Sequence, residues 1–393
     1  MRKLIVVPVF HHALGGATVS LSLMLKGFQQ CGAFEQVRVL VRADSLMEQY
    51  LCQANQESCL HRIHEKDLSQ FMRQALRWVN QQPPDDPLLL ENCMARQLLP
   101  AMLQASPALR LSRRPTYLFF RDLAYSPHPL GKLARKLTLA SLAPRAICNS
   151  KFTASHIQKL LPDVQDVLYP SVDPDKFNDH PPVEPPQELQ PILESGARIM
   201  LTPSRISREE NFNDKNLRSL LLVLAQLKAQ GHNYHSVIVG QDTSPGQIRI
   251  HALREQAEIL GVSDCFSILP PTFAIENYYK YADVVVTLAP REPFGRTVVE
   301  AIACGVPVVG SNCGGIGEIL HNFAPQWTVD PHDPIAAAQA IVRITNDSNT
   351  PISLAQGKRW VEANCSLVSY ARRMMEITAL NSVHQHQEQL VSS

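Results

Sequence analysis

The stretch that decides the fold is Leu288-Ala-Pro-Arg-Glu-Pro-Phe-Gly-Arg-Thr-Val-Val-Glu-Ala-Ile-Ala-Cys-Gly-Val-Pro-Val-Val-Gly-Ser-Asn-Cys-Gly-Gly315. An apolar run ends near Leu288, a tight loop rich in Pro and Gly follows, and a helix is predicted to begin at about Gly295. Gly305 ends that helix, and a second apolar run leads into a Gly-rich turn. This order of strand, helix and strand is typical of a parallel α/β sheet, in which functional loops follow the carboxyl ends of the strands.

Two segments of the chain repeat this pattern. In the first, a helix from Gly15-Gly16 to about Gln30 is predicted, with strands at Leu4–Val9, Val37–Val41, Leu88–Leu90, Thr116–Phe120 and Ala146–Cys148. In the second, predicted helices at Leu217–Gln230, Gln247–Leu260, Glu276–Tyr281 and Thr297–Cys304 separate strands at Arg198–Thr202, Ser236–Val239, Ser267–Leu269, Val284–Leu288 and Val306–Val309. The pattern predicts an α/β protein of two Rossmann-like, doubly wound domains that face each other across a cleft.

The segment from Tyr169 to Gly196 is crowded with proline. Such a run cannot join the interior of a sheet and resists helix, so it predicts a semi-rigid linker. We therefore expect one Rossmann-like domain over residues 1–172, the linker over 173–196 and a second Rossmann-like domain over 197–362. A helix over 363–382 is expected to pack back on the first domain, and residues 383–393 to form a frayed tail.

Composition excludes several classes of protein. The formal net charge of +1 argues against a partner bound through bulk positive charge, such as nucleic acid. None of the nine cysteines forms a C-x-x-C pair, and the histidines are scattered, so no metal site and no disulfide framework is predicted. Several cysteines lie in apolar runs and are expected to be reduced, buried thiols, which indicates a cytoplasmic protein. The apolar start is too short for a signal peptide, and no run reaches the roughly 18 apolar residues of a membrane span.

The predicted helix start beside Gly295 has the chemistry of an anion site. The first turn of a helix presents N–H groups and a partial positive charge that suit a phosphate. Glu292 lies in the loop just before this helix, where a simply solvated carboxylate is the plainer interpretation. Glu300 lies among apolar residues of the helix, and a carboxylate in that setting needs a partner.

Glu292-Pro-Phe-Gly-Arg-Thr-Val-Val-Glu300, followed by Ala-x-Ala-x-Gly-Val-Pro-Val-Val, resembles the signature of the retaining glycosyltransferases of group 1, also called family four. The resemblance extends to Gly15-Gly16 at the first helix, to Ala146–Ser150 and to Tyr169–Asp173. It implies the GT-B fold, with an acceptor domain first and a nucleotide-sugar-binding domain second. It also implies that no metal is required, because protein groups hold the diphosphate.

Carried over residue by residue, the resemblance implies a donor site in the second domain. In this assignment Glu300 binds the ribose, Glu292 lies by the sugar hydroxyls, the N–H groups of Phe294 and Gly295 hold the sugar, and those of Arg296 and Thr297 hold the phosphate. Arg205 and Lys215 match the family's pair of cations that clamp the diphosphate. The insert between them is longer than usual, so Arg208 stays open as a replacement or supplement for either one.

Two features of the first domain leave alternatives open. Gly15 and Gly16, which the resemblance places at the donor, permit close approach of the backbone to an anion or acceptor, or they serve only a structural turn. Where the family commonly has a His before Asp, this chain has Arg121-Asp122. Arg121 is a permanent cation that binds a negative group of the donor or acceptor, or it pairs with Asp122.

The segment Leu130–Leu142 is basic and apolar at helical spacing. A solvated basic face on a helix packed by leucines is the favoured interpretation. Contact of Lys132, Arg135 and Lys136 with anionic lipid stays open as the alternative, which would make the protein peripheral to the inner face of the membrane.

The expected protein is a hexosyltransferase-type enzyme that moves a sugar, with retention, from a nucleotide-diphosphate sugar to a hydroxyl of a glycan, a lipid-linked or a small-molecule acceptor. No cofactor is expected, since the nucleotide sugar is a substrate. Two alternatives remain: a sugar-nucleotide epimerase of the same fold, and a non-catalytic binding module.

Overall fold

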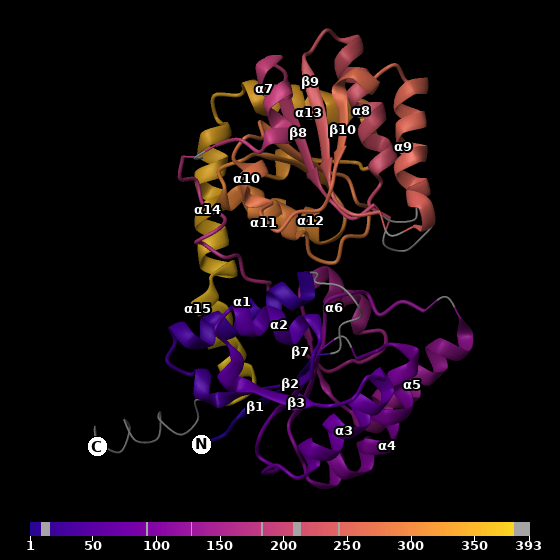
Figure 1. Cartoon of the computed structure of the whole chain (residues 1–393), viewed down its shortest axis with the longest axis vertical. Coiled ribbons are helices and arrows are strands. Elements are labelled where there is room, and N and C mark those ends of the chain that lie inside the picture. The colour runs from indigo at the N-terminus through magenta and orange to yellow at the C-terminus, as the bar shows by residue number, and fades with distance from the viewer. Residues whose placement is uncertain are drawn as a thin grey trace. The chain divides into compact units, whose positions relative to one another are not determined.

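The computed structural model describes residues 1–8, 16–91, 93–126, 128–181, 184–206, 214–242 and 244–380. The chain divides into two compact units. Unit 1 consists of Met1–Ser171 together with Ser366–Ser393, and unit 2 consists of Val172–Cys365. Each unit is built on one parallel sheet with helices packed on it (Figure 1).

The sheet of unit 1 has seven strands in the order β3-β2-β1-β4-β5-β6-β7. Its strands are β1 (Leu4–Pro8), β2 (Val37–Arg42), β3 (Leu60–Ile63), β4 (Leu88–Glu91), β5 (Thr116–Phe120), β6 (Arg145–Cys148) and β7 (Val164–Val167). Its helices are α1 (Gly16–Gln30), α2 (Leu46–Gln53), α3 (Leu68–Asn80), α4 (Leu99–Leu111), α5 (Pro129–Leu142), α6 (Lys151–Ile157) and α15 (Leu367–Ile377). The order runs outward from β1 in both directions, as in doubly wound sheets.

Two cores lie on the two faces of this sheet. Successive residues of a strand point to opposite faces, so Leu4 and Val6 join one core while Ile5 and Val7 join the other. The first core also takes buried residues of α1, α2 and α15, and the second takes those of α3, α4, α5 and α6. The last helix of the chain therefore completes the core of the first unit.

The sheet of unit 2 has six strands in the order β10-β9-β8-β11-β12-β13. Its strands are β8 (Arg198–Pro203), β9 (Tyr234–Val239), β10 (Phe266–Leu269), β11 (Val284–Thr287), β12 (Val308–Ser311) and β13 (Thr328–Val329). Its helices are α7 (Gln190–Glu194), α8 (Leu217–Ala229), α9 (Ile248–Ile259), α10 (Glu276–Tyr279), α11 (Arg296–Ala303), α12 (Gly314–Leu320), α13 (Pro334–Asn346) and α14 (Thr350–Cys365). The order repeats that of unit 1, so the predicted α/β class with two Rossmann-like domains is confirmed.

The sequence prediction missed β3, β7 and β13, which are edge strands of the two sheets. β3 and β7 carry exposed or half-buried polar side chains, and β13 is two residues long. Such strands lack the continuous apolar run by which central parallel strands are recognised in a sequence. The last predicted strand of the second domain, Val306–Val309, was placed early, because β12 begins only at Val308.

The proline-rich segment 173–196 was predicted to resist helix, and this is wrong for its second half. α7 occupies five residues of it, and Leu189 and Ile192 are buried. Pro191 stands in the first turn of α7, the one part of a helix where the missing N–H of proline costs nothing.

Across the described ranges, no helix is both long enough and apolar enough to cross a bilayer. All nine cysteines are free thiols, and Cys148 and Cys304 are buried, as their apolar neighbours predict.

Candidate functional site

The start of α11 follows the carboxyl end of β11, where the sequence places the site. Gly295 is the N-cap residue and adopts a φ of 105°, a region that favours glycine. Because glycine has no side chain, the N-cap residue itself supplies no side-chain cap to this helix start. A helix start with glycine at the N-cap, next to the carboxyl end of a central strand, suits an anionic ligand.

A second glycine-rich turn braces the loop before α11. The N–H of Gly315 donates to the carbonyl of Glu292 at 2.7 Å. A Cβ at Gly315 would lie 2.6 Å from the carbonyl carbon of Phe294, and closer still to its oxygen and Cα. Only glycine at position 315 therefore allows the start of α12 to lie against the loop before α11.

Lys215 and Glu292, which are far apart in the sequence, form an ion pair. Their side chains are 19% and 22% exposed, so each keeps access to solvent. The structure thus joins the residue expected at the diphosphate to the residue expected at the sugar. The ammonium group of Lys215 balances the carboxylate of Glu292.

Asn216 explains how Lys215 is positioned, and the sequence analysis missed it. Its side-chain amide donates to the carbonyls of Pro331 at 2.7 Å and Leu288 at 3.3 Å. It is buried and adopts a left-handed conformation that Asn tolerates better than most residues. Because Asn216 ties three loops together at the start of α8, the backbone next to Lys215 is fixed.

Glu300 is buried and has protein partners for both of its oxygens, as a carboxylate in an apolar helix requires. Oε2 accepts from the Tyr279 hydroxyl at 3.1 Å, and Oε1 accepts from Arg296 Nε at 3.1 Å. Burial raises the pKa of Glu300, and the nearby charge of Arg296 opposes that rise. Burial likewise raises the pKa of Tyr279 well above its ordinary value, with Glu300 adding to the effect.

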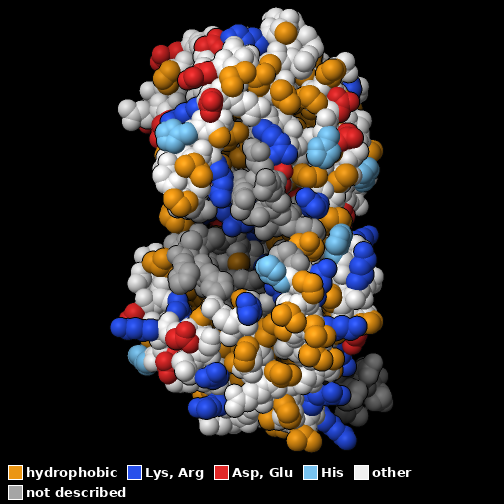
Figure 2. Space-filling model, turned by 90° about the vertical axis from the view of Figure 1, so that its right-hand side faces the viewer, with side chains coloured by type: hydrophobic (Ala, Val, Ile, Leu, Met, Phe, Trp, Pro, Cys, Tyr) orange, Lys and Arg blue, Asp and Glu red, His pale blue; other side chains and the backbone are white. Residues whose placement is uncertain are grey.

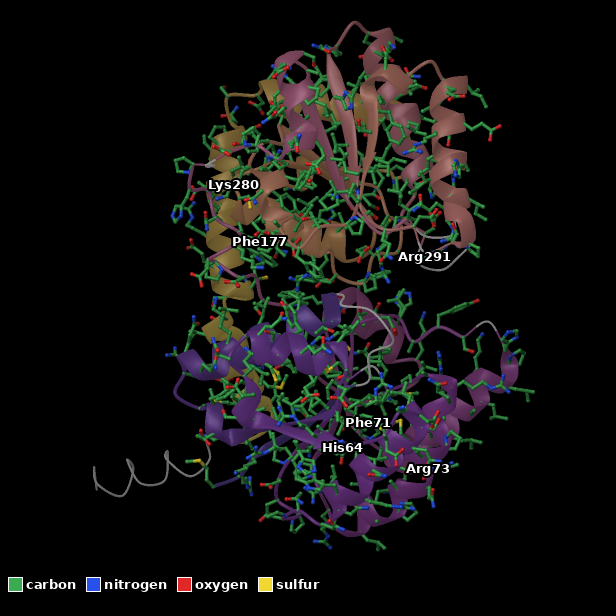
Figure 3. All side chains as sticks on the ribbon, viewed as in Figure 1. His64, Phe71, Arg73, Phe177, Lys280 and Arg291 are labelled. Atoms are coloured by element: carbon green, nitrogen blue, oxygen red, sulfur yellow. The ribbon has the colours of Figure 1, made fainter. Side chains whose placement is uncertain are left out.

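Tyr279 is the second residue that the sequence analysis missed. The ring of Phe177 packs edge-on against it, with the ring centroids 5.9 Å apart. The adjacent Lys280 donates to Asn178 Oδ1 at 3.2 Å. Figure 3 shows Phe177 and Lys280 close together on one side of unit 2. The segment around Phe177 therefore holds α10 in the position from which Tyr279 reaches Glu300.

Arg205 lies in the loop after β8, and its side chain is exposed. Among the described residues, its guanidinium has no hydrogen-bond or ion-pair partner. The backbone of its loop packs closely against Gly240, because a Cβ at that position would lie 2.7 Å from the carbonyl carbon of Ser204. The structure does not bring Arg205 into contact with Lys215, and Arg208 lies outside the described residues.

A different helix start of unit 2 is already filled by the chain itself. Asp242 Oδ2 accepts from the N–H groups of Arg249 and Ile250 in the first turn of α9, both at 3.1 Å. Oδ1 accepts from the N–H and hydroxyl of Ser244. Burial alone would raise the pKa of Asp242, but these hydrogen bonds bring it below its ordinary value. An internal carboxylate thus occupies the anion position at α9.

In unit 1, Arg121 does not pair with Asp122, and that alternative is wrong. Arg121 binds Glu91 Oε1 at 2.9 Å, and its guanidinium lies 4.3 Å from the centre of the Phe119 ring. Asp122 Oδ1 instead accepts from the N–H of Ala124. Glu91 is the last residue of β4 and Arg121 directly follows β5, and the two strands are neighbours in the sheet, so their meeting is a consequence of topology.

Glu91, Arg121 and Asn149 lie together in the interior of unit 1, and not all of their polar atoms have a hydrogen-bond partner. Glu91 Oε2, Arg121 Nε and Asn149 Oδ1 have no hydrogen-bond partner among the described residues. Burial acts to lower the pKa of Arg121, but the charge of Glu91, together with Tyr370, outweighs it, and the pKa of Arg121 rises. Burial raises the pKa of Tyr370, which lies beside this pair.

The other predicted residue of unit 1 is Gly16, which begins α1; its carbonyl accepts from the Ser20 hydroxyl at 2.7 Å. Gly15 lies outside the described residues. Within the parts that are described, no group of three or more His, Cys, Asp or Glu side chains is arranged to hold a metal ion.

Residues 192–360 match the family model described as "Glycosyl transferases group 1". Unit 2 carries a group 1 glycosyltransferase domain. The chain is similar to the D-inositol 3-phosphate glycosyltransferase of Thermobispora bispora, with 26% identity over 265 residues, which is 66% of this chain and 61% of the relative. The enzyme of the same name from Salinispora arenicola is 33% identical over 143 residues, 36% of this chain and 32% of the relative. The matched stretches thus span less than two thirds of these relatives.

Solved structures resemble the group 1 glycosyltransferase domain and unit 1 together. The Anabaena protein HepE in complex with UDP and glucose has a TM-score of 0.76 at 18% identity, covering 97% of this chain and 100% of that one. A glycosyltransferase from Rickettsia africae has a TM-score of 0.74 at 18% identity, covering 98% and 99%. The fold of the chain is GT-B, as the resemblance implies.

Proposed function

We propose that this protein transfers a hexosyl group from a nucleoside diphosphate sugar to a hydroxyl acceptor. The observation that carries the proposal is the pairing of Lys215 with Glu292 in the loop that leads to the start of α11, where the N-cap residue is Gly295. The diphosphate would lie at this helix start, and the ribose would bind Glu300. The match of residues 192–360 to group 1 glycosyltransferases supports the same assignment.

In this mechanism the chain works by positioning and by electrostatics. As the bond between the sugar and the diphosphate breaks, negative charge grows on the departing phosphate. Lys215 and the first turn of α11 would stabilise that charge, with Arg205 closing on the other side, so no metal is needed. Glu292 would orient the sugar hydroxyls, and the transfer would retain the anomeric configuration.

The donor is tested first by thermal shift with UDP, GDP, ADP and TDP and with their sugars. A ligand present at 100 times its Kd stabilises the folded state by about 2.7 kcal/mol, which raises the melting temperature measurably. UDP-glucose is the first sugar to test, because HepE was solved with it. If no nucleotide shifts the melting temperature, the proposal fails.

The reaction is then tested with donor and acceptor together. Inositol 3-phosphate is the first acceptor to test, since the relatives described above are named D-inositol 3-phosphate glycosyltransferases. NMR of the product reports the anomeric configuration, and a chelator in the assay checks independence from metal. An altered nucleotide sugar formed without acceptor would indicate an epimerase instead, and binding without any release of sugar would indicate a non-catalytic module.

A further inference from the structure

One helix on the surface of unit 1 carries an apolar stripe. On α5, Leu130, Leu133 and Leu137 are exposed by 81%, 53% and 55%. Residues at this spacing share one face of a helix. We call these three residues the leucine stripe. The sequence analysis expected the leucines of this helix to pack inward, but only Leu139 and Leu142 do so.

Basic groups lie along the leucine stripe. Lys132 and Lys136 are exposed, and the Nζ of Lys132 lies 5.8 Å from the centre of the Tyr125 ring. Arg135 donates to the carbonyl of Ala124 at 2.7 Å, which holds its guanidinium beside the start of the helix. Figure 2 faces the side on which α5 lies in Figure 1, and there unit 1 shows a broad hydrophobic area with Lys and Arg at its borders.

The charge of the surrounding sequence is strongly one-sided. Between Glu91 and Asp163 the chain has a single acidic residue, Asp122, although its overall net charge is only +1. The same stretch holds eleven basic residues, of which Arg114 is buried and Arg121 pairs with Glu91: Arg96, Arg110, Arg113, Arg114, Arg121, Lys132, Arg135, Lys136, Arg145, Lys151 and Lys159. It contains α4 and α5, and α4 exposes two further leucines, Leu103 and Leu111.

We infer that α5 docks unit 1 on the surface of an anionic lipid bilayer. The leucine stripe would enter the boundary between headgroups and acyl chains, and Lys132 and Lys136 would meet the lipid phosphates. A nucleic acid would satisfy the positive charge but would leave the leucines in water. A second copy of this chain would cover the leucines but would bring the same positive charge against itself. An anionic lipid surface both pairs with the positive charge and removes the leucines from water.

The test is cosedimentation of the whole protein with vesicles at low salt. Vesicles of phosphatidylcholine alone are compared with an equal mixture of phosphatidylcholine and phosphatidylglycerol. The protein should bind the mixture and should leave it when salt is raised, because salt screens the attraction. The variant Lys132→Ala/Lys136→Ala should bind the mixture about 25-fold more weakly, since each basic residue near an anionic surface contributes about fivefold.

The apolar contribution needs its own variant and control. Leu133→Ser/Leu137→Ser should weaken binding more than about tenfold, because the inserted side chains lose most of their apolar area. The matched control is Ile248→Ser/Ile259→Ser on α9 of unit 2, where the side chains are 62% and 78% exposed. This control should bind the mixed vesicles as the wild type does. The side chains of Leu133 and Leu137 are both exposed, so replacing them should leave the melting temperature of the protein unchanged.

Three results would overturn the inference. The first is a wild-type protein that stays in solution with the mixed vesicles, and the second is equal binding to both kinds of vesicle. The third is a protein that is dimeric without lipid and becomes monomeric in the leucine variant, which would mean that a second copy covers the stripe. Nucleotide binding is measured separately by thermal shift, so a failure to bind vesicles leaves the proposed transfer reaction untouched.

Discussion

Replacing Lys215 with alanine tests the electrostatic core of the proposed mechanism. A charge-assisted interaction with the departing diphosphate should contribute about 2 kcal/mol to the transition state. Its loss should lower kcat/KM about thirtyfold, because each 1.36 kcal/mol is tenfold in rate. The assay is release of nucleoside diphosphate from the donor that the thermal-shift screen identifies. Normal turnover by Lys215→Ala would remove Lys215 from the mechanism.

The ion pair with Glu292 complicates this result, because Lys215→Ala also leaves that carboxylate without its partner. A double-mutant cycle separates the two effects. If Lys215 acts on the diphosphate, Lys215→Ala/Glu292→Gln should be slower than Glu292→Gln alone. If the two rates are equal, Lys215 acts only by holding Glu292, and a direct role of its charge at the diphosphate is refuted.

Lys228 offers a matched control for the cycle. It also belongs to unit 2 and also forms an ion pair with a carboxylate, that of Asp264. Both partners are well exposed, and pairs of that kind contribute about 0–1 kcal/mol. Lys228→Ala should therefore leave both stability and turnover close to those of the wild type.

Three further variants probe Glu300 and the loop before α11 in unit 2, and the buried ion pair of unit 1. Glu300→Gln should weaken nucleotide binding about tenfold by calorimetry; unchanged affinity would remove the ribose role. The folded chain holds the proton of Glu300 more tightly than the unfolded chain, so the stability of the wild type relative to Glu300→Gln should fall as pH rises above 4.5, measured by urea unfolding at several pH values. Gly315→Ala should cost about 1–3 kcal/mol and disturb nucleotide binding, because its methyl group meets the backbone of the loop before α11. Gly131→Ala, whose methyl group meets only a serine side chain at close range, is its control and should be tolerated. Glu91→Gln should lower the free energy of unfolding by about 3 kcal/mol, since it leaves Arg121 charged and buried without its partner. A loss below about 1 kcal/mol, or no recovery of stability in Glu91→Gln/Arg121→Met, would argue against a buried pair.

The fold was predictable because the pattern of apolar residues that marks each strand and helix extends over a run of several residues. Central strands such as Leu88–Glu91 and Val284–Thr287 are apolar along nearly their whole length, and the helices between them repeat their apolar positions regularly. The start of α11 was predictable for a similar reason, since Gly295 and the apolar residues after it mark a helix boundary. Glu300 was singled out because its neighbours are apolar, and the prediction that it needs a partner follows from desolvation alone.

The partners themselves were not predictable from local pattern. Tyr279 reaches Glu300 from another helix, and nothing in its surrounding sequence marks it. Asn216 depends on a left-handed backbone conformation that three separate loops hold in place. The pair of Glu91 and Arg121 is a partial exception. Both residues lie at the ends of predicted strands, so the adjacency of those strands could have suggested that the side chains meet at one edge of the sheet.

Two of the helix starts of unit 2, those of α9 and α11, give the strongest physical argument about where a ligand binds. Each follows a parallel strand at its carboxyl end, and each has the N–H groups and the partial charge that attract an anion. At α9 the chain supplies that anion, because Asp242 accepts from two N–H groups of the first turn. At α11 the N-cap is Gly295, which has no side chain to offer, and the cation of Lys215 stands nearby on Glu292. A side-chain cap from the N-cap residue stabilises a helix start by about 1 kcal/mol, and α2, α3, α6, α13 and α15 have one. At α11 we expect an anion from solution in the place that Asp242 fills at α9.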